Sequence, residues 1–239
     1  MTYKYFFGSD KRSVPYLDFI SKEIQDLVVI TTKPRKSGRG NKLTTNPVEN
    51  FCHKNNMIFK YFDESEIYSD MDYGVCVSFG EIFKDDFINS NPPIFNIHLS
   101  RLPEFRGPSP VETAILNGNT LFGYTIFKIV QEIDEGPILY QNDVEVVHNY
   151  SSNVYEALLE DFISSFKYID FKSPLQIQEG NVSVTRKFVK TDYMISKENT
   201  LYEAKNKIKA FDILGPAYIQ YDSKIIKIHK YTEDNSDFK

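Results

Sequence analysis

The sequence predicts an α/β protein built on a Rossmann-like, mostly parallel twisted sheet with a small C-terminal helix and β-hairpin subdomain. Continuous apolar runs such as DLVVITT (26–32) and GVCVSF (74–79) are typical of strands covered on both faces. Helical patterns separate these runs, as βαβ units require. The 239 residues are 41% hydrophobic, which is enough for a buried core.

The first half of the chain contains five predicted strands, at 3–9, 26–32, 58–62, 74–79 and 93–100. A helix is expected over 13–25, where Tyr16, Ile20 and Ile24 recur at helical spacing. A second helix is expected over 47–55, with Pro47 at its first position and Asn46 as its cap. The segment between them, 33–46, is rich in Gly, Pro and Lys and predicts a loop.

The second half begins with a short helix (109–116), two β segments (124–130 and 137–147) and a longer amphipathic helix (153–168). We expect a boundary near Phe171, which divides a catalytic domain (1–171) from a small C-terminal subdomain (172–239). That subdomain should contain an irregular stretch with some strand character (172–194), a helix (200–211) and a hairpin (217–231). The polar residues 233–239 should fray.

Composition excludes several classes of protein. The net charge of −5 argues against a nucleic-acid partner, because such proteins usually carry a basic excess, although it leaves a local basic patch open. Cys52 and Cys76 have no metal-type spacing, so we expect two reduced, buried thiols and no metal. No signal peptide or membrane-spanning apolar run is recognisable. We therefore expect a cytoplasmic protein without a membrane partner.

Three polar residues are candidates for catalysis. Asn96 and His98 stand two apart at the end of a predicted strand, so their side chains leave the same face. Sites in open α/β sheets lie beyond the carboxyl ends of such strands. Asp134 follows in a loop between two β segments, where Gly136 permits close backbone approach. Each residue alone also fits a structural or turn role, so the prediction depends on the combination.

The combination resembles the signature of the 10-formyltetrahydrofolate-dependent formyltransferases. The resemblance is carried by Asn96-x-His98-x-Ser100-x-Leu102-Pro103-x-Phe105-Arg106-Gly107, Gly123-x-Thr125, Asp134-x-Gly136, Phe7-Gly8-Ser9 and Ser78-Phe79-Gly80. Residues 33–47 (KPRKSGRGNKLTTNP) also resemble the Gly-Arg-Gly-Lys-Lys loop of the branch that contains methionyl-tRNA formyltransferases. The likeness extends over about residues 4–141.

The resemblance implies that a primary amine attacks the formyl carbon of 10-formyltetrahydrofolate. The developing oxyanion needs preorganised donors, for which the Asn96 amide and a protonated His98 are candidates. A neutral His98 is expected to accept or relay the amine proton while Asp134 orients the imidazole. The order of these proton transfers stays open.

Binding residues are also implied. Folate is expected between the strand end at Ser78, Phe79 and Gly80 and the loop that contains Gln131, Ile133 and Gly136. The predicted acceptor-binding residues are Lys33, Arg39, Arg106, Lys207, Tyr218 and Tyr221. The cations Lys33, Arg35, Lys36, Arg39 and Lys42 could form a solvated loop, or could attract a diphosphate or the folate glutamate tail. Arg106 could instead brace its own loop.

The predicted acceptor is a nucleotide-linked amino sugar. Residues 172–239 are too few for the C-terminal barrel of methionyl-tRNA formyltransferases, and 207–211 with 215–218 look like the sugar N-formyltransferases. That likeness implies dTDP-4-amino-4,6-dideoxyglucose as substrate, in O-antigen and lipopolysaccharide biosynthesis. The alternatives are a methionyl-tRNA formyltransferase, or a folate- or nucleotide-binding protein without catalysis. An oxidoreductase is disfavoured because no G-x-G-x-x-G follows the first strand. The exposed edge of the C-terminal hairpin predicts a homodimer.

Overall fold

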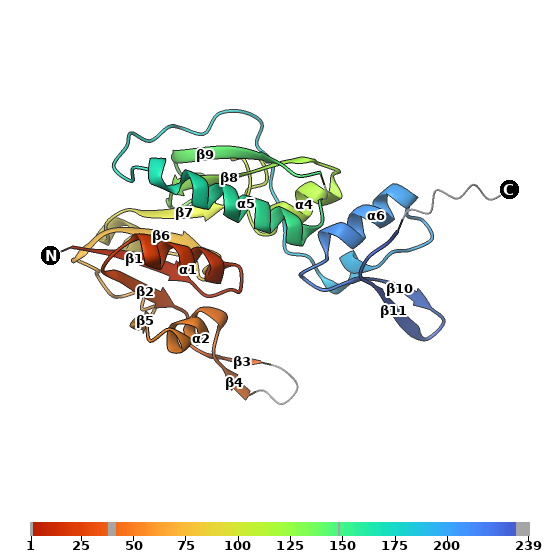
Figure 1. Cartoon of the computed structure of the whole chain (residues 1–239), viewed down its shortest axis with the longest axis horizontal. Helices are drawn as coiled ribbons and strands as arrows, with labels where there is room; N and C mark the ends of the chain where they lie inside the picture. The colour runs from red at the N-terminus through yellow and green to blue at the C-terminus, as the bar shows by residue number, and fades with distance from the viewer. Residues whose placement is uncertain (1, 38–41, 148, 233–239) are drawn as a thin grey trace. The chain divides into compact units, whose positions relative to one another are not determined.

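A computed structural model describes residues 2–37, 42–147 and 149–232. Its central element is a seven-stranded sheet of order β5-β2-β1-β6-β7-β8-β9 (Figure 1). The strands are β1 (Tyr3–Gly8), β2 (Leu27–Thr31), β5 (Phe59–Tyr61), β6 (Met71–Val77), β7 (Ile94–His98), β8 (Leu121–Lys128) and β9 (Ile138–Glu145). The pairings from β5 through β7 are parallel, whereas β8 runs antiparallel to β7. The predicted α/β class with a mostly parallel sheet is confirmed.

The strand order reverses at β1, which lies between β2 on one side and β6 on the other. The chain therefore builds β2 and β5 outward in one direction before it returns to add β6 and β7. Such a reversal leaves a crevice at the carboxyl ends of the strands, where ligands of open α/β sheets bind. The carboxyl end of β7 is His98, so the predicted site residues lie at this edge.

Helices α1 (Ser13–Glu23) and α2 (Pro47–Lys54) follow β1 and the 33–46 segment. Helix α1 buries Tyr16, Leu17 and Ile20, which its helical spacing places on one face. Asn46 caps α2 as predicted, since its side-chain oxygen accepts from the Glu49 N–H at 3.0 Å. The other helices are α3 (Asp85–Ser90), α4 (Pro110–Leu116), α5 (Ser151–Ser165), α6 (Leu201–Ala210) and the 3₁₀ turns Phe166–Tyr168 and Lys190–Tyr193.

Aromatic rings fill much of the core beside β1 and β6. Phe7 meets Phe79 and Phe83 edge to face, with centroids 5.7 Å and 5.4 Å apart. Tyr68 and Phe87 belong to the same buried cluster. Aromatic pairs of this geometry contribute about 0.5–1.5 kcal/mol each beyond the area they bury. Much of the Phe and Tyr content therefore serves packing.

Two segments differ from the prediction. Residues 33–46, expected to be a loop, contain an antiparallel ribbon of β3 (Arg35–Ser37) and β4 (Lys42–Thr44). The six-residue helix α3 was not predicted. Both have almost no apolar periodicity, because the described side chains of the ribbon are exposed and α3 buries one residue, Phe87. Strand formation in the ribbon depends on backbone pairing, which the residue pattern does not reveal.

The chain divides into two compact units, each assembled from three segments. The first takes in the described parts of Met1–His98, Tyr124–Gln141 and Phe162–Glu179, and the second those of Leu99–Gly123, Asn142–Asp161 and Gly180–Lys239. The predicted boundary near Phe171 divides the chain at a single point, whereas each of these units contains three segments. The boundary stays a prediction. No described helix is both long enough and apolar enough to span a membrane.

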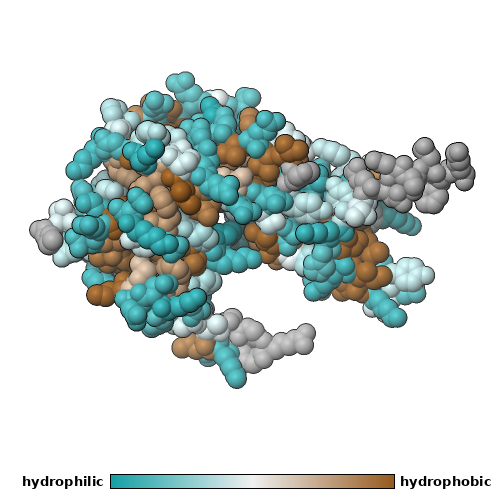
Figure 2. Space-filling view, in the orientation of Figure 1, coloured by the Kyte–Doolittle hydropathy of each residue, from teal (hydrophilic) through white to brown (hydrophobic). Residues whose placement is uncertain are grey.

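The predicted hairpin is present in the second unit as β10 (Ala217–Tyr221) and β11 (Lys224–Ile228). Apolar side chains gather over it in Figure 2, and Tyr221, Ile225 and Ile226 are substantially exposed. An exposed apolar hairpin is compatible with a dimer contact, and the homodimer stays a prediction.

Candidate active site

Strand β7 presents Asn96 and His98 on one face of the sheet. In the antiparallel register with β8, Asn96 lies opposite Phe127 and His98 opposite Thr125. His98 is buried, and its ring meets the Phe127 ring edge to face at 6.5 Å. Asn96 is half-buried, and its side-chain amide has no hydrogen-bond partner in the described part of the chain. This amide is therefore available to a bound molecule.

Asp134 approaches His98 from the loop between β8 and β9. Its Oδ2 lies 3.5 Å from His98 Nδ1, and the two side chains are only 13% and 7% exposed. Burial raises the pKa of the Cys76 thiol, and the negative charge of Asp134 raises it further. Cys76 pairs with Asn96 across β6 and β7, so the Asp134 carboxylate lies close to the predicted site. The structure thus brings the three predicted catalytic residues together, although His98 and Asp134 are 36 positions apart in the sequence.

The loop that carries Asp134 is tightly constrained. Asp134 has a left-handed φ of 57°, which few residues other than glycine adopt. A Cβ on Gly136 would stand 1.7 Å from the Lys128 carbonyl oxygen, so no side chain fits at this position. The Lys128 N–H donates to the Pro137 carbonyl at 2.9 Å and closes the base of the loop. The predicted close backbone approach at Gly136 is confirmed.

Two glutamines support this site without having been predicted. Gln178 Nε2 donates to the carbonyl oxygens of Asp134 and Gly136, each at 2.8 Å. Gln141 Nε2 donates to Oγ1 of the fully buried Thr125, the residue opposite His98, at 2.8 Å. Nothing in the sequence pattern distinguishes these glutamines from others, because their contacts come from tertiary packing.

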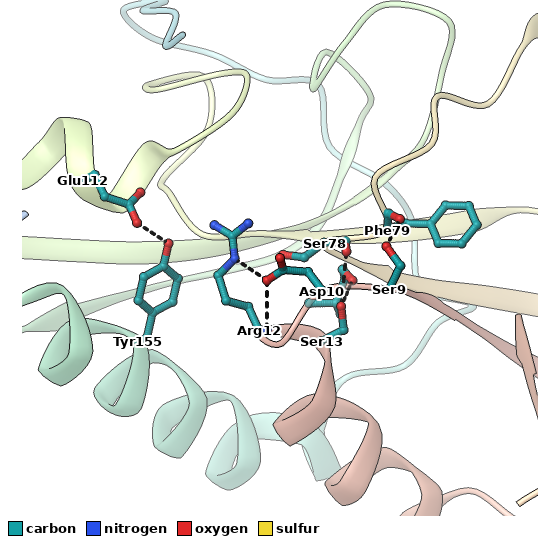
Figure 3. A network of polar contacts seen from close by, with 9 residues as sticks. Ser9, Asp10, Arg12, Ser13, Ser78, Phe79, Glu112 and Tyr155 are labelled. Carbon is teal, nitrogen blue, oxygen red and sulfur yellow. Dashed lines mark hydrogen bonds and ion pairs between the residues drawn. The ribbon is translucent and has the colours of Figure 1, made fainter. Parts of the chain in front are cut away.

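The predicted folate-side turn is fixed by the start of α1 (Figure 3). Ser13 Oγ donates to the Val77 carbonyl at 2.6 Å, the Asp10 N–H donates to the Ser78 carbonyl at 3.3 Å, and Ser9 Oγ donates to the Phe79 carbonyl. Ser78 and Gly80 both have positive φ, at 45° and 81°. The Phe79 side chain is buried in the aromatic cluster. Any ligand contact of this turn at Phe79 must therefore use its backbone.

A cavity of about 470 Å³ opens beside the Asp134 loop in the first unit. Its lining includes α3 residues such as Ile88, the start of β7 at Ile94, and Ile129 and Gln131 after β8. The volume falls within the range of small-molecule pockets, and a mixture of apolar walls and a few polar groups suits an aromatic heterocycle. Of the six predicted folate residues, only Gln131 is among those that line this cavity; the others are Ser78, Phe79, Gly80, Ile133 and Gly136.

The predicted acceptor-binding residues have separate environments. Lys33 is exposed in the first unit, and Arg39 lies outside the described residues. In the second unit, Arg106 exchanges backbone hydrogen bonds with Ser183 and Thr185. Lys207 Nζ donates to the Met194 carbonyl at 2.6 Å, and the Tyr218 carbonyl accepts from the Ile195 N–H at 2.7 Å.

Tyr221 is 67% exposed at the end of β10. The acceptor-binding roles of these residues stay predictions.

Cys52 and Cys76 are free and buried, as expected. Among the described residues, no cluster of three His, Cys, Asp or Glu side chains could hold a metal ion.

The fold and the site define a class of protein. A mostly parallel sheet with a reversal in strand order presents an amide, an imidazole and a carboxylate at one edge, and the loop that carries Asp134 also contributes Gln131 to a ligand-sized cavity. Groups of these kinds can supply the hydrogen-bond donors and acid–base functions that an α/β group-transfer enzyme requires.

Comparison with known proteins identifies the group that is transferred. The family model described as formyl transferase matches residues 10–165, which is more than half of the chain. The protein therefore belongs to the formyl transferase family, and its chemistry is formyl transfer.

Individual relatives differ in their acceptors. The methionyl-tRNA formyltransferase of Thermosipho melanesiensis is 31% identical over 93% of this chain and 77% of its own. Among solved structures, the sugar 3N-formyl transferase WlaRD, determined with dTDP and 5-N-formyl-THF, is 26% identical with a TM-score of 0.70 over 90% of this chain and 80% of that one. A 4-N formyltransferase from Francisella tularensis has a TM-score of 0.72 and 20% identity over 97% of this chain and 98% of that one. At this identity, the likeness shows the fold alone.

Proposed function

We propose that this protein transfers the formyl group of 10-formyltetrahydrofolate to the amine of methionyl-tRNA, with Asn96, His98 and Asp134 as its catalytic residues. The observation that carries the chemistry is the buried His98–Asp134 contact of 3.5 Å beside the available Asn96 amide. The acceptor is supported by the 31% identity to a tRNA formyltransferase along nearly the whole chain. This similarity favours tRNA over the amino sugar expected from the sequence.

Charge stabilisation is the first requirement of the reaction. As the amine nitrogen bonds to the formyl carbon, negative charge develops on the formyl oxygen. The Asn96 side-chain amide supplies a preorganised N–H donor, and His98 supplies a second donor when it is protonated. The loss of one such donor typically lowers turnover by about 100- to 1000-fold.

Proton movement is the second requirement. The attacking amine loses one proton, and N10 of the folate gains one as its bond to the formyl carbon breaks. His98 Nδ1 lies 3.5 Å from Asp134 Oδ2, so the carboxylate faces this side of the ring. The Asp134 carboxylate holds the ring in this orientation and stabilises the imidazolium when His98 carries the proton. Positioned acid–base groups contribute about 100- to 10,000-fold.

The residues at the cavity suit the folate donor. The side chains of Ile88, Ile94 and Ile129 offer apolar surface to an aromatic ring system, while Gln131 and backbone groups of the Asp134 loop can pair with its polar edge. Gln131 is three residues before Asp134, so a donor in this cavity lies next to the catalytic loop. When bound, the folate supplies the formyl group and its leaving nitrogen.

A basic ribbon supports a nucleic-acid acceptor. Lys33, Arg35, Lys36 and Lys42 are exposed on and beside β3 and β4, although Arg35 is paired with Glu81. The overall charge of −5 led us to expect no nucleic-acid partner. A local cluster of cations can nevertheless contact phosphates when the rest of the surface is acidic.

A nucleotide-linked amino sugar is the second candidate acceptor. It is favoured by the 26% identity and TM-score of 0.70 to WlaRD, a sugar 3N-formyl transferase whose structure contains dTDP. The same three catalytic residues would serve either amine. The two candidates therefore differ only in what binds the rest of the acceptor.

One assay separates these candidates. The protein is incubated with 10-formyltetrahydrofolate and, separately, with methionyl-tRNA, dTDP- and UDP-linked amino sugars, and glycinamide ribonucleotide. Formylation of methionyl-tRNA alone supports the proposal, whereas turnover only with amino sugars assigns the second candidate. No transfer to any acceptor, with folate still bound, would favour a binding role without catalysis.

A further inference from the structure

The segment 172–179 lies outside the helices and strands, yet it is tied to the chain around Asp134. Gln176 exchanges two backbone hydrogen bonds with Ile138 at the start of β9, at 2.7 and 2.8 Å. Two residues later, the Gln178 side chain crosses to the loop itself. Its Nε2 donates to the carbonyl oxygens of Asp134 and Gly136, both at 2.8 Å.

This single amide meets an electrostatic need of the loop. Asp134 has a left-handed backbone conformation, and Gly136 is tightly packed against Lys128. The backbone of the loop therefore has little freedom to turn these two carbonyls toward other donors. Leaving a partly buried carbonyl without a donor costs about 1–3 kcal/mol. A side-chain NH₂ group has two donors, so Gln178 can satisfy both carbonyls at once.

We propose that Gln178 is a positioning residue for formyl transfer, whose side-chain amide holds the Asp134 loop where the carboxylate contacts His98. The inference rests on the proposed catalytic role of Asp134. The contact between His98 Nδ1 and Asp134 Oδ2, at 3.5 Å, is already at the outer limit of a hydrogen bond. A small outward movement of the loop would therefore break it.

Three variants test the proposal. Gln178→Glu keeps the size of the side chain but replaces the NH₂ group, and with it both donors, by a carboxylate oxygen that repels the two carbonyls. Gln178→Lys supplies N–H donors from another side chain. Gln176→Glu is the matched control, because it places the same new charge in the same segment, on an exposed residue that contacts Ile138 through its backbone.

Hydrogen exchange tests whether Gln178 holds the Asp134 loop, and it needs no acceptor. Amide exchange of 131–137 should become at least about tenfold faster in Gln178→Glu and should stay unchanged in Gln176→Glu. Unchanged exchange in Gln178→Glu would overturn the proposal. This measurement remains decisive if the wild-type protein formylates no acceptor. Failure of the proposed function and failure of the proposed role of Gln178 are therefore distinguishable.

Kinetics test the consequence for catalysis. At saturating substrates, kcat should fall by about 10- to 100-fold in Gln178→Glu, with acceptor KM little changed, and Gln178→Lys should recover most of it. In an Asp134→Asn background, Gln178→Glu should lower kcat by less than about twofold more, because both changes act on one contact. Faster loop exchange with normal kcat, or a full additional loss in the Asp134→Asn background, would contradict a positioning role.

Discussion

Substitution of Gly136 by alanine should displace the catalytic carboxylate without touching it. The new Cβ would stand 1.7 Å from the Lys128 carbonyl oxygen, whereas such atoms normally stay about 3.2 Å or more apart. The backbone must therefore open by roughly 1.5 Å. Asp134 is two residues away and contacts His98 at only 3.5 Å, so this movement separates the pair. Misplacement by about 1 Å can lower turnover by about 100-fold.

The assay measures kcat for formyl transfer by Gly136→Ala, on protein whose circular dichroism matches the wild type. We expect a loss of about 100-fold and a lower Tm, since the substitution would strain the hydrogen bond from the Lys128 N–H to the Pro137 carbonyl. Glu135→Ala, an exposed neighbour in the same loop, is the control and should stay within about twofold of wild type. Wild-type turnover by Gly136→Ala would refute the account of how the loop positions Asp134.

Three further predictions concern charge and stability. In the second unit, the Arg186 guanidinium lowers the pKa of Asp192 to about 2. The ion pair therefore stabilises the fold at pH values above the ordinary aspartate pKa, and this stabilisation is lost as the pH falls through about 2. Arg186→Gln should therefore lower Tm at pH 6, by an amount that corresponds to about 1 kcal/mol or less, and leave Tm at pH 2 nearly unchanged; equal losses at both pH values would contradict this. Thr200→Ala removes the side-chain cap of α6 and should cost about 1 kcal/mol in urea unfolding, and an unchanged midpoint would count against it. The double variant Lys36→Glu with Lys42→Glu should raise KM for methionyl-tRNA at least about fivefold at low salt, but not KM for an amino sugar; an equal effect on both would remove the ribbon from tRNA binding.

The sequence predicted those parts of the fold that depend on apolar pattern. The apolar runs at 26–32 and 74–79 are buried strands, and the alternation of Asn96 and His98 placed both on one face. The ribbon of β3 and β4 escaped prediction because its described side chains are exposed and backbone pairing forms it.

The candidate site was predictable only in part. Spacing alone could not bring Asp134 to His98, and the family resemblance was needed to connect them. The contact of Gln178 with the loop could not be predicted from the sequence. Gln178 follows Asp134 by 44 positions and Gly136 by 42, and only the folded chain brings them together. The hydrogen bond from the Lys207 ammonium group to the Met194 carbonyl was likewise not predictable from the pattern, and the acceptor-binding role of Lys207 stays a prediction.

We propose that the Asn96 amide and the His98–Asp134 pair carry formyl transfer. The most direct test is single-turnover transfer from 10-formyltetrahydrofolate to methionyl-tRNA by the wild type, Asn96→Ala and His98→Ala, with folate binding measured in parallel. We expect formylation by the wild type and losses of about 100- to 1000-fold in each variant, with folate affinity largely retained. Near wild-type transfer by either variant would contradict the claim.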